Sequence, residues 1–144
     1  MDENKKIRIL IKKPKEEAEI VEIEDKLENL QEIVGGLIDC TPLPGRDDID
    51  IFFNDEGKIM HLDGNVWLAG PGGDCIVGTC YFVGYDSETG ESVSLTDKQI
   101  KECQKYIKTF ELGKDIDLYS DYLWLVPKML EKSEKYLKKS FLEM

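Results

Sequence analysis

The sequence predicts an α+β domain with a mainly antiparallel sheet of about five strands, two packed helices and a helical C-terminal extension. Three observations support this class. Strand-like alternation dominates the N-terminal half, a capped amphipathic helix follows at 96–110, and the chain becomes helical and rich in aromatic residues after residue 112. We place the α+β domain at 1–111 and the extension at 112–144, as a lid over the sheet or a contact between subunits. Pro127 fits the first turn of the last helix.

The strands are predicted from alternating apolar and polar residues. Segments 5–13 and 18–24 alternate on either side of a polar turn, so we expect a hairpin in which a lysine-rich strand faces a glutamate-rich strand. Two further strands are expected at 37–40 and 48–54. Residues 75–85 are almost all apolar, which predicts one strand buried on both faces at the centre of the sheet.

Two helices precede the extension. Residues 25–34 carry apolar side chains at helical spacing, with Asp25 as the expected N-cap and Gly35 at the C-terminal end. The helix at 96–110 opens with a capping box, because Thr96 is followed by a glutamine three positions later. Both helices have an apolar face suited to packing on the sheet.

The composition restricts the classes of function. The chain has 30 acidic and 19 basic residues and a net charge of −11. Such a chain is repelled by phosphates, so we expect no direct binding of nucleic acid. It contains no apolar run long enough to span a membrane and no apolar stretch of the signal-peptide type near residue 1. We therefore expect no membrane contact and a cytoplasmic location.

The sequence shows few of the residue patterns that catalytic or metal sites require. The four cysteines, Cys40, Cys75, Cys80 and Cys103, form no Cys-x-x-Cys pair, and His61 is the only histidine. We predict no metal site and no cofactor. A nucleophilic Cys75 or Cys80 needs a base beside it in space, which leaves a cysteine hydrolase as an open alternative. We otherwise expect no enzymatic activity and name no catalytic residue.

A glycine-rich segment supplies the candidate ligand site. Gly72 and Gly73 precede a strand rather than a helix, so the segment is no Walker or Rossmann loop. A tight turn is the simpler interpretation, but backbone amides there can still face an anion while aromatic rings stack on a base. The candidate ligand-binding residues, taken from this loop, the first strand and nearby aromatics, are Arg8, His61, Asn65, Trp67, Gly72, Gly73 and Tyr81.

Acidic residues suggest a second mechanism. Segments 16–32 and 39–63 hold eight and seven acidic residues. Carboxylates spaced along a rigid surface can imitate a phosphate track and occupy the groove of a basic protein. A solvated surface is the simpler interpretation. A ligand-binding protein should have a localised positive pocket, whereas a nucleic-acid mimic should have a contiguous acidic face.

Six short motifs carry a resemblance to a known family. In order they lie at 7–14, 21–24, 27–36, 54–58, 74–79 and 94–100. The ordered set resembles the domain-of-unknown-function family numbered 3846, found in bacteriophages, plasmids and Firmicutes genomes, over roughly residues 6–110. The segments 60–73 and 112–144 depart from the family pattern. The resemblance implies a small accessory protein of a mobile element in a bacterial cytoplasm and assigns no catalytic residue.

We therefore predict a non-enzymatic binding protein of a phage or mobile element. The leading hypothesis is counter-defence by sequestering a nucleotide-type immune signal, with the protein acting as a homo-oligomer. The alternative is an acidic nucleic-acid mimic that inhibits a basic defence protein of the host. A regulatory or structural module without a role in defence stays open.

Overall fold

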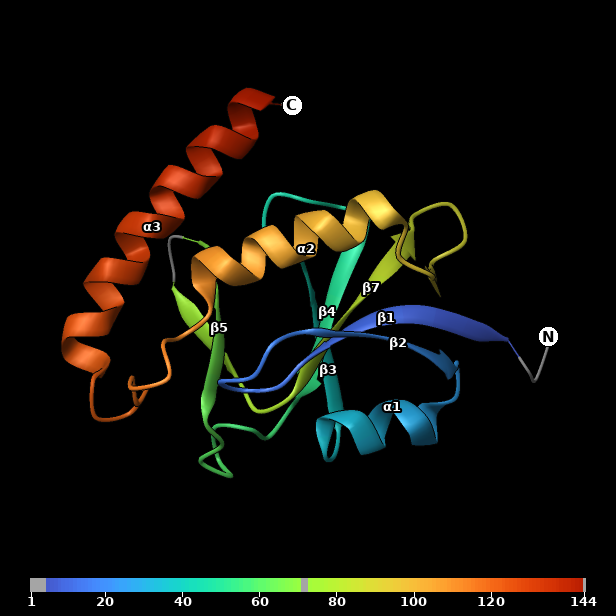
Figure 1. Ribbon diagram of the computed structural model, residues 1–144, viewed down its shortest axis with the longest axis horizontal. Helices are drawn as coiled ribbons and strands as arrows, with labels where there is room; N and C mark the ends of the chain where they lie inside the picture. Colours follow the sequence, from blue (N-terminus) through green and yellow to red (C-terminus); the bar gives the residue numbers. More distant parts are fainter. Residues whose placement is uncertain (1–4, 71–72, 144) are drawn as a thin grey trace.

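Two helices cover opposite faces of an antiparallel sheet, which confirms the predicted α+β class (Figure 1). The computed structural model describes residues 5–70 and 73–143. The elements in these residues are β1 (Lys6–Lys12), β2 (Glu19–Glu24), α1 (Leu27–Val34), β3 (Ile38–Pro42), β4 (Ile49–Asn54), β5 (Gly64–Leu68), β6 (Asp74–Val77), β7 (Cys80–Asp86), β8 (Glu91–Val93), α2 (Asp97–Phe110) and α3 (Tyr122–Glu143). None of these helices combines the length and apolar character needed to cross a lipid bilayer.

The main sheet is built around β7. Its strands follow the order β2-β1-β7-β4-β3, with every pair antiparallel, and β8 adds to the C-terminal half of β7. β7 occupies the centre because its first five residues are buried, so both of its faces can be covered. The predicted N-terminal hairpin is confirmed, with Lys6 opposite Glu24 and Arg8 opposite Glu22.

The continuous strand predicted over 75–85 is wrong, because the chain changes direction at Gly78. This glycine has a left-handed φ of 76°, and a Cβ placed on it would lie 2.7 Å from Leu62 Cδ1. The residues before the turn, β6, pair with β5 and form a separate two-stranded sheet. β5 lies between residues 58 and 74, where the sequence shows no clear period.

The two faces of the main sheet bury separate apolar cores. Neighbouring side chains on β1 and β7 point to opposite faces, as strand geometry requires. Ile9 and Tyr81 belong to the smaller core, which α1 covers. Leu10 and Phe82 belong to the larger core, which α2, α3 and the β5–β6 hairpin cover. Figure 1 shows α2 and α1 on opposite sides of the sheet.

The helix ends agree only in part with the sequence patterns. Gly35 adopts a φ of 79° and ends α1 as predicted, but the N-cap is Lys26 without a side-chain cap, so the assignment of Asp25 is wrong. The capping box of α2 is confirmed. Thr96 Oγ1 accepts a hydrogen bond from the Gln99 amide at 3.1 Å, and Gln99 Oε1 accepts one from the Thr96 amide at 2.9 Å.

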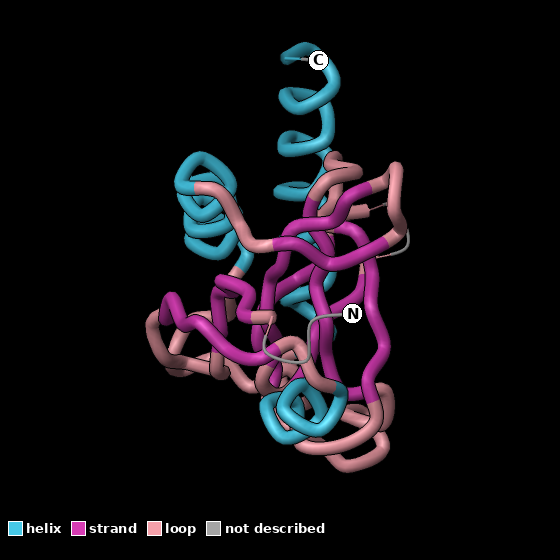
Figure 2. The backbone as a smooth tube through the Cα atoms, turned by 90° about the vertical axis from the view of Figure 1, so that its right-hand side faces the viewer, coloured by secondary structure: helices cyan, strands magenta, loops and turns pink. Residues whose placement is uncertain are grey.

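The C-terminal extension is one continuous helix packed on the larger core. Pro127 lies inside α3 rather than in its first turn, so that prediction is wrong. Proline removes one backbone hydrogen bond there, and Leu125 and Met129 fix the helix by burial in the larger core. The preceding loop is held because the Tyr119 hydroxyl donates to the Leu62 carbonyl at 2.6 Å. The last turns of α3 extend beyond the sheet (Figure 1 and Figure 2).

Candidate functional site

The residues proposed from the sequence as a ligand site do not meet at one place. Arg8 lies on β1, where its guanidinium donates to the Leu95 carbonyl at 2.9 and 2.7 Å and pairs with Asp97 at 2.9 Å. The arginine therefore fastens the start of α2 to β1. Arg8 lies opposite Glu22 on β2, but among the described contacts its ion pair is with Asp97 and not with Glu22.

Trp67 and Tyr81 are buried in different cores. Trp67 is 1% exposed in the larger core, and Tyr81 is 1% exposed in the smaller core, where it stacks on Phe52 with ring centroids 5.1 Å apart. Burial raises the pKa of the Tyr81 hydroxyl well above its usual value. Neither ring presents a face to solvent, so in this structure neither can stack on a ligand.

Asn65 takes part in a buried polar cluster with Lys12. The Lys12 ammonium donates to the Lys13 carbonyl at 2.7 Å and to Asn65 Oδ1 at 3.2 Å, and the Asn65 amide donates to the Lys12 and Gly78 carbonyls at 2.8 and 2.9 Å. Burial lowers the pKa of Lys12. The cluster joins β1, β5 and the turn before β7. Asn65 and Lys12 therefore have a structural role.

The two remaining described candidates lie apart from this cluster. His61 is exposed and stacks on Tyr119 at a centroid distance of 3.7 Å. Gly73 has a φ of 50°, and a Cβ there would lie 2.7 Å from Leu130 and 3.0 Å from Trp67, so close packing explains this glycine. Gly72 lies outside the described residues. The candidate set therefore forms no common pocket in the part of the chain that is described.

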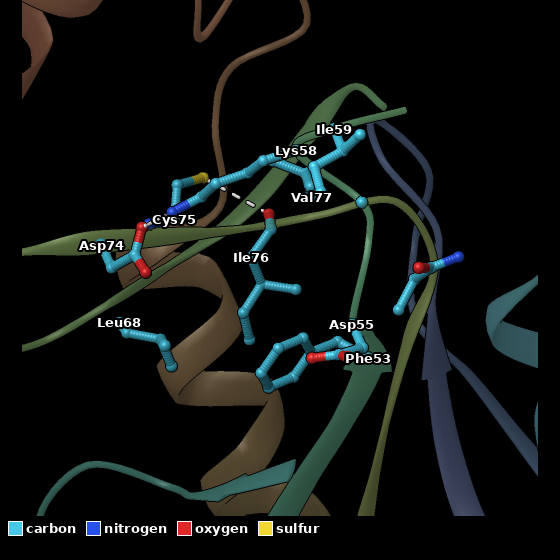
Figure 3. Close-up of a pocket in the computed structure, with 11 residues that line it drawn as sticks. Phe53, Asp55, Lys58, Ile59, Leu68, Asp74, Cys75, Ile76 and Val77 are labelled. Atoms are coloured by element: carbon cyan, nitrogen blue, oxygen red, sulfur yellow. Dashed lines mark hydrogen bonds and ion pairs between the residues drawn. The ribbon is translucent and has the colours of Figure 1, made fainter. Parts of the chain in front are cut away.

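A small pocket opens beside the β5–β6 hairpin (Figure 3). Its volume is about 190 Å³, its lining is largely apolar, and Lys58 and Asp74 form an ion pair across it. Pockets that hold drug-sized ligands measure about 300–1,000 Å³. This pocket is therefore too small for a nucleotide.

A much larger groove of about 760 Å³ lies between α2, α3 and the β3–β4 connection. It holds seven of the 19 basic residues and one of the 30 acidic residues of the chain. Its lining residues are Leu43, Gly45, Arg46, Lys98, Glu102, Lys105, Tyr106, Lys108, Thr109, Lys132, Lys135, Tyr136 and Lys139. We call it the basic groove. In a chain with a net charge of −11, this concentration of cations is a localised positive site.

Helical periodicity places these cations in two rows. The α2 row consists of Lys98, Lys105 and Lys108, and the α3 row consists of Lys132, Lys135 and Lys139. Residues three, four or seven apart lie on one face of a helix, so each row follows the side of its helix that borders the groove. Two successive helices, separated by residues 111–121, thus supply facing walls of like charge.

The single arginine of the groove is already neutralised. Arg46 donates from Nε and Nη2 to the two Asp48 carboxylate oxygens at 2.9 and 2.7 Å, and its Nη1 pairs with Glu102. Burial would raise the pKa of Asp48, but hydrogen bonds from Arg46 and Gln99 hold it below its usual value. This ion-pair cluster closes one side of the groove and adds no net positive charge.

The lysines supply the excess charge. Among the described residues, Lys98, Lys105 and Lys108 have no carboxylate within ion-pair distance. Lys132 donates to the Thr109 carbonyl at 3.4 Å, and Lys135 pairs with Glu131 on the same helix at 3.4 Å. Both contacts are exposed and long, so an anion in the groove can compete with them.

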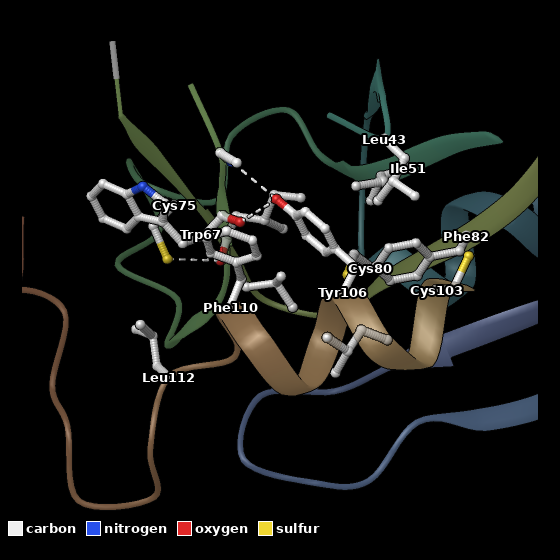
Figure 4. Packing of buried hydrophobic residues seen from close by; sticks show 14 of the residues in the cluster. Leu43, Ile51, Trp67, Cys75, Cys80, Phe82, Cys103, Tyr106, Phe110 and Leu112 are labelled. Atoms are coloured by element: carbon white, nitrogen blue, oxygen red, sulfur yellow. Dashed lines mark hydrogen bonds between the residues drawn. The ribbon is translucent and has the colours of Figure 1, made fainter. Parts of the chain in front are cut away.

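The floor of the groove is uncharged and rigid. The Tyr106 hydroxyl donates to the Trp67 carbonyl at 2.7 Å and accepts from the Ala69 amide at 3.0 Å (Figure 4). The Tyr136 ring meets Tyr106 edge-on at 5.3 Å, and its hydroxyl donates to the Pro44 carbonyl at 2.9 Å. Both hydroxyls therefore have protein partners, and the floor presents mainly carbon surface.

The comparison with protein families matches residues 7–111 to the domain-of-unknown-function family 3846. The chain belongs to that family. The family-3846 domain contains β1 to β8, α1 and α2, whereas α3 lies outside the matched residues. The α2 row is therefore part of the family-3846 domain and the α3 row is not. No curated protein and no solved structure matches the chain.

Burial gives three of the four cysteines of the family-3846 domain little nucleophilic character, whereas Cys40 is exposed. Burial raises the pKa values of Cys75, Cys80 and Cys103 to about 12, so these thiols are protonated near neutral pH. The only histidine, His61, stacks on Tyr119 instead of pairing with a thiol. Within the described residues, no three side chains of the metal-ligating types His, Cys, Asp and Glu converge on one point. The two rows of lysines make the basic groove a site suited to binding an anion.

Proposed function

We propose that this protein binds a small phosphorylated ligand of nucleotide type in the basic groove and holds it without chemical conversion. The observation that carries the proposal is the concentration of six lysines around one groove of a strongly acidic chain. Like charges on facing helices repel each other, so an anion between them stabilises the folded protein. The groove volume also falls in the range of small-molecule sites.

The biological setting extends this proposal. The resemblance to proteins of phages and plasmids implies an accessory role on a mobile element, acting in the cytoplasm of a bacterial host. A protein that binds a nucleotide signal without converting it lowers the free concentration of that signal. We therefore propose counter-defence by ligand sequestration, and homo-oligomerisation stays a prediction beside it.

The test is ligand-dependent stability of the full chain. Thermal unfolding is followed with a panel of mononucleotides, cyclic di- and trinucleotides and ADP-ribose derivatives, alongside light scattering to determine the oligomeric state. A ligand at 100 times its dissociation constant adds about 2.7 kcal/mol of stability, which raises the melting temperature by several degrees. A melting temperature that no panel member changes contradicts the proposal. Conversion of a bound ligand to product contradicts its non-enzymatic part.

A second candidate function rests on the acidic side chains at the other end of the molecule. Exposed carboxylates lie along the edge strand β2 and the helix α1 after it, at Glu19, Glu22, Glu28 and Glu32. Figure 1 shows β2 and α1 far from α3. This arrangement favours an acidic nucleic-acid mimic that binds a basic protein. Salt-sensitive capture of a basic host protein, abolished by Glu→Gln changes on β2 and α1, would support the mimic.

A further inference from the structure

We infer that the basic groove selects ligands whose anionic groups stand at two ends of an uncharged middle. The inference rests on the proposed function and specifies its ligand class. The groove prefers a nucleoside with phosphates at two separate positions, or two nucleotides joined to each other, over a nucleotide whose phosphates form one chain.

The first argument is the arrangement of the cations in two rows. The α2 row and the α3 row stand on separate helices, and the floor between them is formed by Leu43, Tyr106 and Tyr136. At a rise of about 1.5 Å per residue, the α2 row extends about 15 Å and the α3 row about 10 Å. A single cluster of phosphates neutralises one end of the rows and leaves the other lysines facing each other.

The second argument is the polarity of the floor. The hydroxyls of Tyr106 and Tyr136 already donate to the carbonyls of Trp67 and Pro44, and Leu43 is buried beside them. A phosphate placed over this floor would lose hydration without gaining hydrogen bonds. A base or a sugar placed there loses much less, and its flat face suits the partly exposed Tyr136 ring.

The third argument is the ion-pair cluster of Arg46, Asp48 and Glu102. An arginine is the side chain best suited to grip a phosphate with two hydrogen bonds. Here Asp48 and Glu102 hold that arginine, so it gives no strong single anion site. The remaining cations are lysines, which act as dispersed point charges along both walls. Such walls favour separated charges over one focus of charge.

The experiment compares three adenine nucleotides by isothermal titration calorimetry with the full chain. Adenosine 3′,5′-bisphosphate carries two phosphates at separate positions, ADP carries two in one chain, and AMP carries one. We expect the bisphosphate to bind at least tenfold more tightly than ADP, and ADP to bind no more than a few-fold more tightly than AMP. The base and sugar are the same in all three, so the ratio reports the arrangement of the phosphates.

Two paired variants separate the walls. Lys105→Gln with Lys108→Gln weakens the α2 row, and Lys132→Gln with Lys135→Gln weakens the α3 row. Each pair should weaken binding of the bisphosphate at least tenfold, whereas AMP should be affected by only one of them. The matched control changes the same net charge outside the groove, at the exposed Lys101 and Lys114, and should leave all three affinities within threefold. Circular dichroism confirms that each variant is folded.

The outcomes distinguish the two proposals. If the bisphosphate and ADP bind equally and both depend on the rows, the selectivity is overturned and the groove remains an anion site. If the control pair weakens binding as much as the row pairs, net charge alone governs binding and the selectivity is likewise overturned. If none of the three nucleotides binds, nor any member of the wider panel, the proposed function fails and the inference fails with it.

Discussion

Tyr106→Phe is the sharpest test of how α2 is fixed to the rest of the protein. The Tyr106 hydroxyl is the only side-chain group described as bonding to both Trp67 and Ala69 of the β5–β6 hairpin, at 2.7 and 3.0 Å. The residue is 2% exposed, so water cannot replace the lost hydroxyl. The substitution keeps the ring and its packing and removes one oxygen atom.

The expected cost follows from the two groups left without a partner. A buried carbonyl or amide that loses its hydrogen bond costs about 1–3 kcal/mol, so the loss of both should lower the free energy of unfolding by about 2–6 kcal/mol. At about 3 °C per kcal/mol for a domain of this size, the melting temperature should fall by roughly 6–18 °C.

The assay is urea and thermal unfolding of the wild type and two variants. Tyr122→Phe is the matched control, because Tyr122 is 51% exposed and no hydrogen bond is described for its hydroxyl. Its effect should stay within about 0.5 kcal/mol. A loss of less than about 0.5 kcal/mol for Tyr106→Phe would refute the reasoning, since it would mean that the hydroxyl contributes little to holding α2 on the hairpin.

Three further predictions concern other buried groups. Because burial lowers the pKa of Lys12, the unfolded state binds more protons than the native state as the pH rises towards the unfolded value of about 10.5. The free energy of unfolding of Lys12→Met minus that of the wild type should therefore decrease between pH 7 and pH 10. If urea titrations show that this value stays constant or increases over the range, Lys12 is not a buried ammonium. Alkylation at pH 8 followed by mass spectrometry should modify the exposed Cys40 within minutes and the three buried cysteines only after unfolding; rapid modification of all four would argue against the burial described. Gly78→Ala should cost about 1–3 kcal/mol, because alanine strains the left-handed backbone and meets Leu62, and an unchanged denaturation midpoint would show that the turn is not required.

Most of the main sheet could be predicted because its faces bury different cores. On β1, every second residue faces the smaller core, namely Ile7, Ile9 and Ile11. This period of two can be read directly from the sequence. The break at Gly78 was not visible, since a glycine within an apolar run is compatible with both a continuous strand and a turn. The hairpin it creates depends on a left-handed backbone and on contact with Leu62.

The candidate site was harder to predict, because it is formed by elements that meet only in space. The lysines at 98, 105 and 108 and those at 132, 135 and 139 have helical spacing in the sequence, but such spacing is also typical of a solvated helix face. The two rows form a groove because α3 packs beside α2, where Tyr136 contacts Tyr106 and Phe110. Trp67 and Tyr81 show the reverse case, since a large aromatic residue suits a core as well as a ligand site.

The position of α3 relative to the family domain has a consequence for how ligand choice can diversify. One wall of the basic groove belongs to residues 7–111 and the other to a helix that follows them. A protein with the same domain and a different C-terminal segment would keep the first wall, the floor contributed by Leu43 and Tyr106, and the whole sheet. It would present a different second wall to the proposed ligand, so a change of tail would alter ligand preference while the sheet and the smaller core stay as they are.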